Sequence, residues 1–245
     1  MLTNFIEMEF LKLKRSKIFL VTLLGCLVIP FLLSGEFLYV QSQGNQLLFD
    51  LFLSESNLYF LSMFGVVLFA VIANHLFTRE YNEHTLKSIL TLPVSKTKYL
   101  TGKFSMYLLW ILILSIFTFL SSSLCFILLG GDGFTWTIFF KMFKELIFGS
   151  ILLYLAMSPL VFLSILMKNS VFIMIASAGI VFGNMLVYGK VFAPLFPWIS
   201  PFIISAGKLG EYTYGTLTPS LIILATFIIG VFITWLYTYK SDVPL

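Results

Sequence analysis

Charged residues are scarce in this sequence. Asp, Glu, Lys and Arg make up 11% of the chain, whereas hydrophobic residues make up 59% and the mean hydropathy is +1.01. Soluble domains carry roughly 25% charged residues, and a soluble core of this length could not hide so much apolar surface. The composition therefore excludes an ordinary soluble domain and predicts a chain whose solvent is lipid.

The sequence also lacks the pattern of a membrane β-barrel. Barrel strands show segments of about ten residues in which apolar and polar side chains alternate. Here the apolar runs do not alternate and reach about 20 residues, the length of a transmembrane helix. Because backbone groups in lipid must bond to one another, we expect an all-α membrane protein with a single transmembrane domain over residues 1–245.

Groups that carry catalysis or bind metals are few. Cys26 and Cys125 both fall inside apolar runs, where the simplest interpretation is a small buried hydrophobe. His75 and His84 stand in no metal-ligand spacing with Cys, Asp or Glu. The chain has no Gly-x-Ser-x-Gly motif, no intramembrane pair of aspartates and no Gly-rich loop ending in Gly-Lys-Ser/Thr. We expect no catalytic residues, no metal site and no cofactor in this chain, with an enzyme as the weaker alternative.

Ionisable side chains are nearly absent from the middle of the apolar runs. Ion-coupled transporters and pumps usually place carboxylates, His or Lys at that depth. The main deep polar groups are Asn184 and the run Ser121–Ser123, which we expect to form hydrogen bonds between helices. A transporter of this kind would take its energy from another subunit and would offer its substrate an apolar path.

Six apolar runs are long enough to cross a bilayer. We predict spans at residues 18–39, 57–77, 104–129, 146–167, 171–188 and 219–239. Pro30 is expected to kink the first span. In the fifth span Gly179 and Gly183 are four residues apart, a spacing that lets helices approach closely and predicts helix packing or a dimer contact. The alternative is a spacing that arises by chance.

Two segments outside the spans carry apolar residues. Residues 1–17 are predicted to form an amphipathic helix at the membrane interface, the alternative being a helical extension of the first span. Residues 189–218 combine several prolines and glycines with apolar side chains around residues 192–206. This combination predicts a broken, re-entrant segment whose backbone is sheltered by protein.

The basic residues predict how the chain is oriented. Six spans place both termini on one side of the membrane, and that side carries eleven of the fifteen Lys and Arg residues. Because cytoplasmic loops carry the excess of Lys and Arg, we expect both termini and residues 79–103 in the cytoplasm, and residues 189–218 outside. Nucleic acid is not an expected partner, since the basic residues flank lipid-length runs and form no single face.

Residues 79–103 form the longest clearly polar stretch. Read as a helix, the stretch has one apolar face that carries Leu86, Ile89 and Leu90. The opposite face carries Glu80, Glu83 and Lys87. A short amphipathic helix between two spans suits docking to a cytoplasmic partner, whereas the alternative is a solvated loop.

This stretch resembles the first cytoplasmic loop of type-2 ABC-exporter permeases. The resemblance lies in the residues EYNEHTLKSILTLPVSK from Glu80 to Lys96 and in Leu-Thr-Gly-Lys from Leu100 to Lys103. That family typically reads Glu-x-x-x-Gly-Thr-Leu, then Leu-Leu, a Pro with Ser nearby, and Gly-Lys where the third span starts. The chain departs from this pattern at His84, where Gly is common. The N-terminal interfacial helix, the six spans and the re-entrant segment before the last span are also similar to that family.

The resemblance implies partners and a mechanism. Two permeases, identical or related, pair with two copies of a cytoplasmic ABC ATPase subunit, which binds ATP and Mg. Residues 80–90 would be the coupling helix, seated in a groove of the ATPase, whose closure would switch the transmembrane path. The positions carried over to this coupling role are Glu80, Tyr81, Glu83, His84, Thr85, Leu86 and Lys87.

Within that family, small six-span permeases rich in Phe, Ile and Leu resemble those that give bacteria resistance to antimicrobial or amphipathic peptides. This resemblance implies peptide export across the bacterial cell membrane, with lipid and the peptide as partners. Two alternatives stay open: export of drugs or lipid-linked molecules, and a membrane scaffold or sensor that transports nothing.

Overall fold

The computed structural model of the chain describes residues 17–44, 46, 48–82 and 96–240. Over these residues the regular structure is helical, with one isolated bridge between Leu48 and Asp132. The all-α prediction is therefore confirmed. The predicted interfacial helix at residues 1–17 lies outside the described residues, except for Lys17, the first residue of α2.

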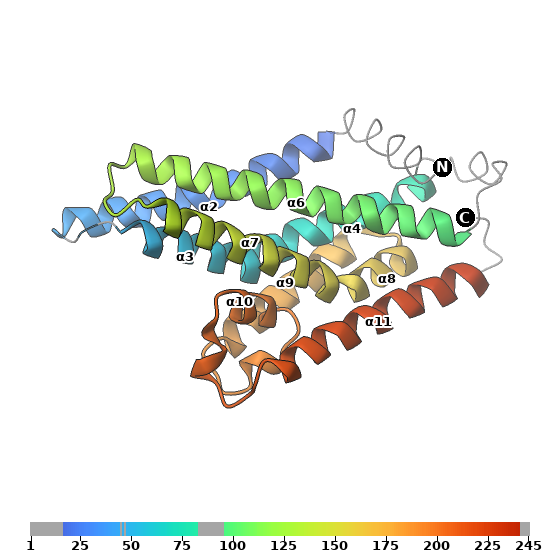
Figure 1. Cartoon of the computed structure of the whole chain (residues 1–245). Helices are drawn as coiled ribbons and strands as arrows, with labels where there is room; N and C mark the ends of the chain where they lie inside the picture. Colours follow the sequence, from blue (N-terminus) through green and yellow to red (C-terminus); the bar gives the residue numbers. More distant parts are fainter. Residues whose placement is uncertain (1–16, 45, 47, 83–95, 241–245) are drawn as a thin grey trace.

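Six helical passes run alternately in opposite directions (Figure 1). Five are long and apolar enough to cross a membrane, or six when α7 and α8, which meet at a 44° bend, count as one broken span. Each pass overlaps one of the six predicted runs, although α6 begins at Lys96, eight residues before the predicted start at Phe104. Their elements are α2 (Lys17–Ser42), α3 (Phe49–Tyr59) with η1 (Phe60–Phe64) and α4 (Gly65–Asn82), α6 (Lys96–Leu128), α7 (Trp136–Ala156) with α8 (Ser158–Met167), α9 (Ser170–Val187) and α11 (Leu217–Lys240).

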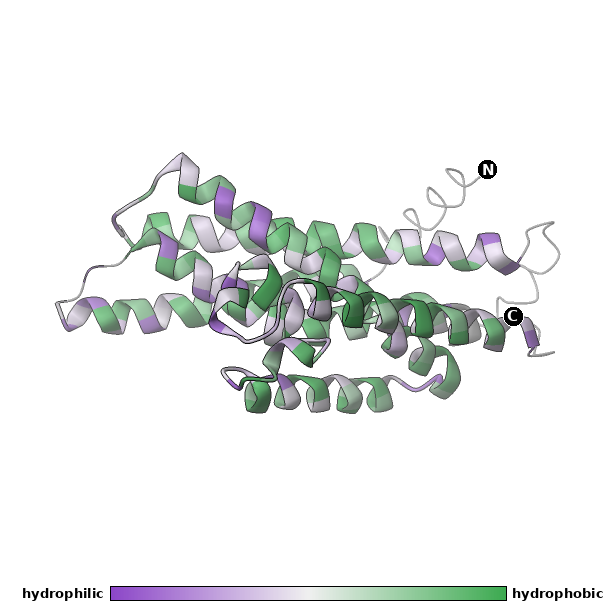
Figure 2. Ribbon diagram, turned by 60° about the horizontal axis from the view of Figure 1, so that its bottom comes forward, coloured by the Kyte–Doolittle hydropathy of each residue, from purple (hydrophilic) through white to green (hydrophobic). Residues whose placement is uncertain are grey.

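The outer surface of the bundle is apolar. Figure 2 shows hydrophobic residues along the length of the helices. Large apolar side chains such as Phe31, Ile175 and Phe232 are more than half exposed. Contiguous exposed apolar surface on this scale is unfavourable in water and ordinary in lipid. The surface thus agrees with a multi-pass membrane protein.

The pass that contains α4 lies at the centre of the bundle. In the most apolar 18 residues of this pass, 67% of the residues are buried, compared with 17% in α9 and 22% in α11. α4 packs against α6, α8 and α9, while α2 packs mainly on α6, and α11 mainly on α8 and α7. The end of the bundle where α4 ends at Asn82 and α6 begins at Lys96 is called the Asn82–Lys96 end below.

The second pass begins earlier than predicted. Helix α3 starts at Phe49, eight residues before the predicted start at Asn57. The charged residues of this segment gave it the appearance of a linker, but Asp50 is exposed and Glu55 only half-buried, while Phe49 and Phe52 are fully buried. One helix face packs in the core and the other carries the charges, so the segment extends the span.

The second pass also contains a π-helical turn. In η1 the backbone N–H of Gly65 bonds to the carbonyl of Phe60, five residues back. A Cβ atom at Gly65 would lie 2.5 Å from that carbonyl oxygen, closer than real side chains come. The turn therefore needs glycine at this position. Such turns are frequent at functional sites.

The fourth pass differs from its prediction at both its start and its break. It begins at Trp136, ten residues before the predicted Leu146, after Thr135 accepts a hydrogen bond from the Ile138 N–H at 3.3 Å. The helix breaks at Met157, and Pro159 lies in the first turn of α8. A proline there keeps its fixed φ and loses no helical hydrogen bond. By contrast, α2 continues through Pro30 without a break.

The segment between α9 and α11 is broken into short helices, η2 (Ala193–Leu195), α10 (Ser200–Ser205) and η3 (Lys208–Glu211), which form a compact group (Figure 1). Apolar side chains of this segment turn into the protein: Ile199, Phe202 and Ile203 are buried, and α10 packs on α7. Burial inside the protein therefore accounts for the apolar residues of this segment. The placement of the segment at the outer membrane surface stays a prediction.

Candidate functional site

Of the seven residues expected to couple to an ATPase, the structure describes the backbone of two. Glu80 and Tyr81 lie in the last turn of α4, and the other five, Glu83, His84, Thr85, Leu86 and Lys87, lie outside the described residues. Residues 83–95 join the end of α4 to the start of α6. For this region the structure therefore describes the end of α4 and the start of α6, which flank the segment.

Lys103 lies at this end and is almost completely buried. Its side chain is 1% exposed, and its Nζ donates a hydrogen bond to the backbone carbonyl of Leu76 in α4. The same Nζ lies 5.8 Å from the ring centroid of Phe77 and 4.9 Å from that of Tyr99. Among the side chains that the structure describes, Lys103 is the one charged side chain that is buried.

The sequence interpretation missed this role of Lys103. It counted Lys103 with Lys96 and Lys98 as a basic residue in cytoplasmic water, whereas only the latter two are exposed. The available signal was helical phase. Lys103 falls among the inward-facing positions Leu100, Phe104 and Tyr107, so a helical wheel would have placed it in the protein interior.

Two further hydrogen bonds join helices at the Asn82–Lys96 end. Lys96 Nζ donates to the backbone carbonyl of Thr238 at 3.2 Å, which connects the start of α6 to the end of α11. Asn74 Nδ2 donates to Ser170 Oγ at 2.9 Å, which connects α4 to the first residue of α9. The helices α4, α6, α9 and α11 are thus linked to one another at the end where residues 83–95 are attached.

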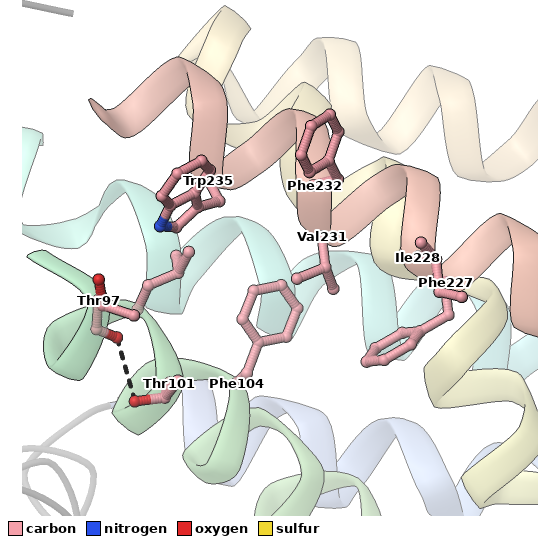
Figure 3. Close-up of a pocket in the computed structure, with 9 residues that line it drawn as sticks. Thr97, Thr101, Phe104, Phe227, Ile228, Val231, Phe232 and Trp235 are labelled. Atoms are coloured by element: carbon pink, nitrogen blue, oxygen red, sulfur yellow. Dashed lines mark hydrogen bonds between the residues drawn. The ribbon is translucent and has the colours of Figure 1, made fainter. Parts of the chain in front are cut away.

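A groove of about 350 Å³ lies between α6 and α11 near the same end (Figure 3). Its walls are apolar and rich in aromatic rings. The hydroxyl of Thr101 bonds back to the Thr97 carbonyl at 3.1 Å, which satisfies it within its own helix. Such a surface can accept apolar groups but offers little to bind a polar molecule. The lining residues are Thr97, Leu100, Thr101 and Phe104 of α6 and Phe227, Ile228, Val231, Phe232 and Trp235 of α11.

The deep polar groups form hydrogen bonds between helices, as predicted for two of them. Asn184 Nδ2 donates to the carbonyl of Ser62 in η1 at 2.7 Å, which joins α9 to the π-turn. Ser122 Oγ lies 2.8 Å from Ser56 Oγ, in hydrogen-bond contact between α6 and α3. Ser121 instead bonds to the Thr118 carbonyl of its own helix. Ser123 is buried, and its Oγ has no hydrogen-bond partner among the described residues, so the prediction fails for Ser121 and Ser123.

Gly179 and Gly183 have different surroundings in α9. A Cβ atom at Gly183 would lie 3.0 Å from the Phe196 ring, so this glycine packs on the segment before α11. A Cβ atom at Gly179 would have nothing within 4 Å. The two glycines therefore do not form one helix-packing surface within the chain. A contact of Gly179 with a second copy stays a prediction.

Over the part of the chain that the structure describes, no group of three or more His, Cys, Asp or Glu side chains is arranged to hold a metal ion. Both cysteines are free; Cys26 is buried and Cys125 is half-buried. The described side chains thus offer buried hydrogen bonds, one buried lysine and an apolar groove.

Comparison with known proteins adds two findings. The family model described as "ABC-2 family transporter protein" matches residues 5–184. A Bacillus licheniformis protein named "Bacitracin transport permease protein BCRB" is 32% identical over 195 residues, which cover 78% of this chain and 91% of that protein. No solved structure matches the chain.

Proposed function

This chain belongs to the ABC-2 family of transporter proteins, and we propose that, as the membrane-spanning permease subunit of such a transporter, it exports antimicrobial or amphipathic peptides from a bacterial cell or its membrane. The observation that carries the proposal is the similarity to a protein named for bacitracin transport, which extends over 91% of that protein. A match of this extent leaves little room for a different transmembrane architecture in the two chains.

The chemistry of the interior supports an amphipathic substrate. The buried polar groups are mostly hydroxyls and amides with partners inside the protein, and the α6–α11 groove is apolar. Recognition of a strongly charged substrate would need buried charges, which are costly in a membrane and usually functional where they occur. The one buried charged side chain, among those described, already donates to a backbone carbonyl.

The proposal includes the partners that supply energy. Two copies of a cytoplasmic ABC ATPase bind ATP and Mg, and two permeases, identical or related, form the membrane part. Glu80, Tyr81 and residues 83–87 contact the ATPase, and both chain termini face the cytoplasm. Support for this arrangement comes from the family membership and from the helix links at the Asn82–Lys96 end.

Peptide sensitivity of cells tests the proposed function. The permease and its cognate ATPase are expressed together in a bacitracin-sensitive host, and minimal inhibitory concentrations are measured for bacitracin, a lantibiotic, a helical lytic peptide and a non-peptide drug. We expect a rise of at least fourfold for one or more peptides and none for the drug.

The control is the same pair with the P-loop lysine of the ATPase replaced, which should abolish protection. Equal sensitivity to all peptides with and without the pair would contradict peptide export. Protection against the drug alone would favour a drug exporter, and absence of the ATPase from the purified complex would favour a scaffold or sensor.

A further inference from the structure

We propose that Lys103 is a positioning residue that fixes the start of α6 to the end of α4, so that residues 83–95 displace both helices as one unit. The proposal rests on the proposed function, because it takes an ATPase acting on residues 83–95 as the source of the displacement. It goes further by naming the side chain that prevents the two helices from responding separately.

The burial of Lys103 is not what a membrane anchor requires. The side chain follows the first residue of α6 by seven positions, about 10 Å along a helix axis. A long basic side chain near a helix end normally extends to the interface and keeps its charged group in water. Lys96 and Lys98 are exposed in this way, whereas Lys103 is 1% exposed. Burying a charged group is costly unless it is paired and hydrogen-bonded. A lysine that only anchors a helix at the membrane surface would therefore not be buried.

One hydrogen-bond acceptor of Lys103 belongs to the backbone of the helix that precedes residues 83–95. Its Nζ donates to the carbonyl of Leu76, which stands six residues before the end of α4 at Asn82. The ring of Phe77 completes the contact on the α4 side. Since the acceptor is backbone, α4 cannot release Lys103 by a change of side-chain rotamer.

A second donor of α6 repeats the contact one turn further along. The hydroxyl of Tyr107 donates to the backbone carbonyl of Phe69 at 3.1 Å. Lys103 and Tyr107 are four residues apart on α6, and their acceptors, Leu76 and Phe69, are seven residues apart on α4. Two such bonds along antiparallel helices oppose both sliding and separation. The rings of Phe77 in α4 and Phe104 in α6 also pack against each other, with centroids 5.2 Å apart.

The connection between α6 and α11 is different. There the apolar groove separates the two helices, and Lys96 bonds to the Thr238 carbonyl at its end. A displacement that α4 and α6 share should therefore change the width of this groove. Thr101, which is exposed and lines it (Figure 3), is a suitable position for a reporter.

The first experiment measures coupling in proteoliposomes that contain the permease and its ATPase. ATP hydrolysis and bacitracin transport are measured for Lys103→Met, which keeps the aliphatic stem without a donor, and for Lys103→Arg, which keeps charge and donors. We expect Lys103→Met to hydrolyse ATP within twofold of wild type and to transport at least tenfold less. Lys103→Arg should recover transport to within threefold. Lys240→Met, at an exposed lysine of α11, should behave as wild type.

The second experiment needs no transported substrate. Cys26 and Cys125 are replaced by Ala, Thr101→Cys is introduced, and its maleimide labelling rate is measured with and without ATP and vanadate. We expect at least a threefold change of rate on nucleotide trapping with Lys103 or Arg at position 103, and less than 1.5-fold with Met. Failure of wild type to transport bacitracin would thus count against the proposed substrate, while the labelling rates still decide the role of Lys103.

Three results would overturn the proposal. The first is a Lys103→Met variant that transports as much bacitracin per ATP hydrolysed as wild type. The second is an equal loss of ATP hydrolysis and transport in Lys103→Met and Lys103→Arg, together with a lower melting temperature. That result would mean that Lys103 only stabilises the packing of the helices. The third is an unchanged maleimide labelling rate of Thr101→Cys, with Lys at position 103, when ATP and vanadate are added. That result would mean that the groove between α6 and α11 does not change on nucleotide trapping.

Discussion

Gly65 and Gly35 differ in the space that a side chain would have at each position. Gly65 stands against the Phe60 carbonyl of the π-turn, whereas Gly35 in α2 has no atom within 4 Å of an added Cβ. Gly65→Ala should lower the free energy of unfolding by about 2 kcal/mol, because overpacking a fixed backbone contact costs about 1–3 kcal/mol. Gly35→Ala should leave it unchanged or raise it slightly, since Ala favours helix over Gly by about 1 kcal/mol.

Reversible unfolding in mixed micelles measures both changes. The comparison is direct, because each variant adds the same methyl group to a helix of the same chain. Equal stability of the two variants would show that the π-turn can shift away from the new methyl group, and would contradict the steric account of Gly65.

Asn184 gives a second prediction at this scale. Its side chain is 1% exposed and joins α9 to the π-turn through the Ser62 carbonyl. Asn184→Ala should lower the free energy of unfolding by about 1 kcal/mol, the range measured for hydrogen bonds between helices in membranes. Met185→Ala, at the neighbouring position and 58% exposed, is the control and should change it less. A larger loss for Met185→Ala would mean that this face of α9 is not in lipid.

At the scale of helices, substitutions at Gly230 and Gly179 distinguish packing within the chain from packing between two chains. A Cβ atom at Gly230 of α11 would lie 2.7 Å from the backbone of Ser158, so α11 and α8 touch here. Gly230→Leu should therefore lower the melting temperature of the monomer and weaken the contact between these helices. Gly179→Leu should leave the melting temperature unchanged, because its side has no neighbour in the chain.

Crosslinking in native membranes then shows whether Gly179 contacts a second copy. We expect Gly179→Leu to reduce the dimer fraction at least threefold. A dimer fraction equal to that of wild type would show that the four-residue spacing of the glycines arose by chance.

The helices also show what the sequence could predict. Six apolar runs and a broken segment before the last one followed from hydropathy and proline content, because lipid imposes a minimum length on every span. The early start of α3 did not follow, since Asp50 and Glu55 resemble loop residues unless the buried Phe49 and Phe52 on the other face are known. Lys103 was misplaced for the same reason: composition counts a lysine as polar, whereas the direction of its side chain depends on the packing of α4 against α6.

At the scale of the whole molecule, α4 and α6 form a central pair of helices, and residues 83–95 connect them in the sequence. The pass with α4 is the most buried, and α6 holds it by two bonds from side chain to backbone. The outer helices α9 and α11 are mostly exposed to lipid and connect to this pair near the Asn82–Lys96 end. A displacement of α4 and α6 would thus reach two helices whose outer faces are exposed.

A charge reversal at residues 83–95 tests this transmission at its origin. Glu83 lies outside the described residues, and its role follows from the family resemblance. Glu83→Lys should leave membrane insertion and expression unchanged while reducing association with the ATPase at least tenfold, because it places a cation where the partner is expected to meet a carboxylate. Wild-type association of this variant would assign the contact to other residues of the stretch.

ATP-dependent movement of peptide by the purified complex tests the central claim most directly. The permease and its ATPase are reconstituted in liposomes, and the transfer of labelled bacitracin across or out of the bilayer is followed with ATP and with a non-hydrolysable analogue. The account predicts transfer with ATP that is at least tenfold faster than with the analogue, and that is lost in Glu83→Lys. Equal rates with both nucleotides, in a complex that hydrolyses ATP, would contradict it.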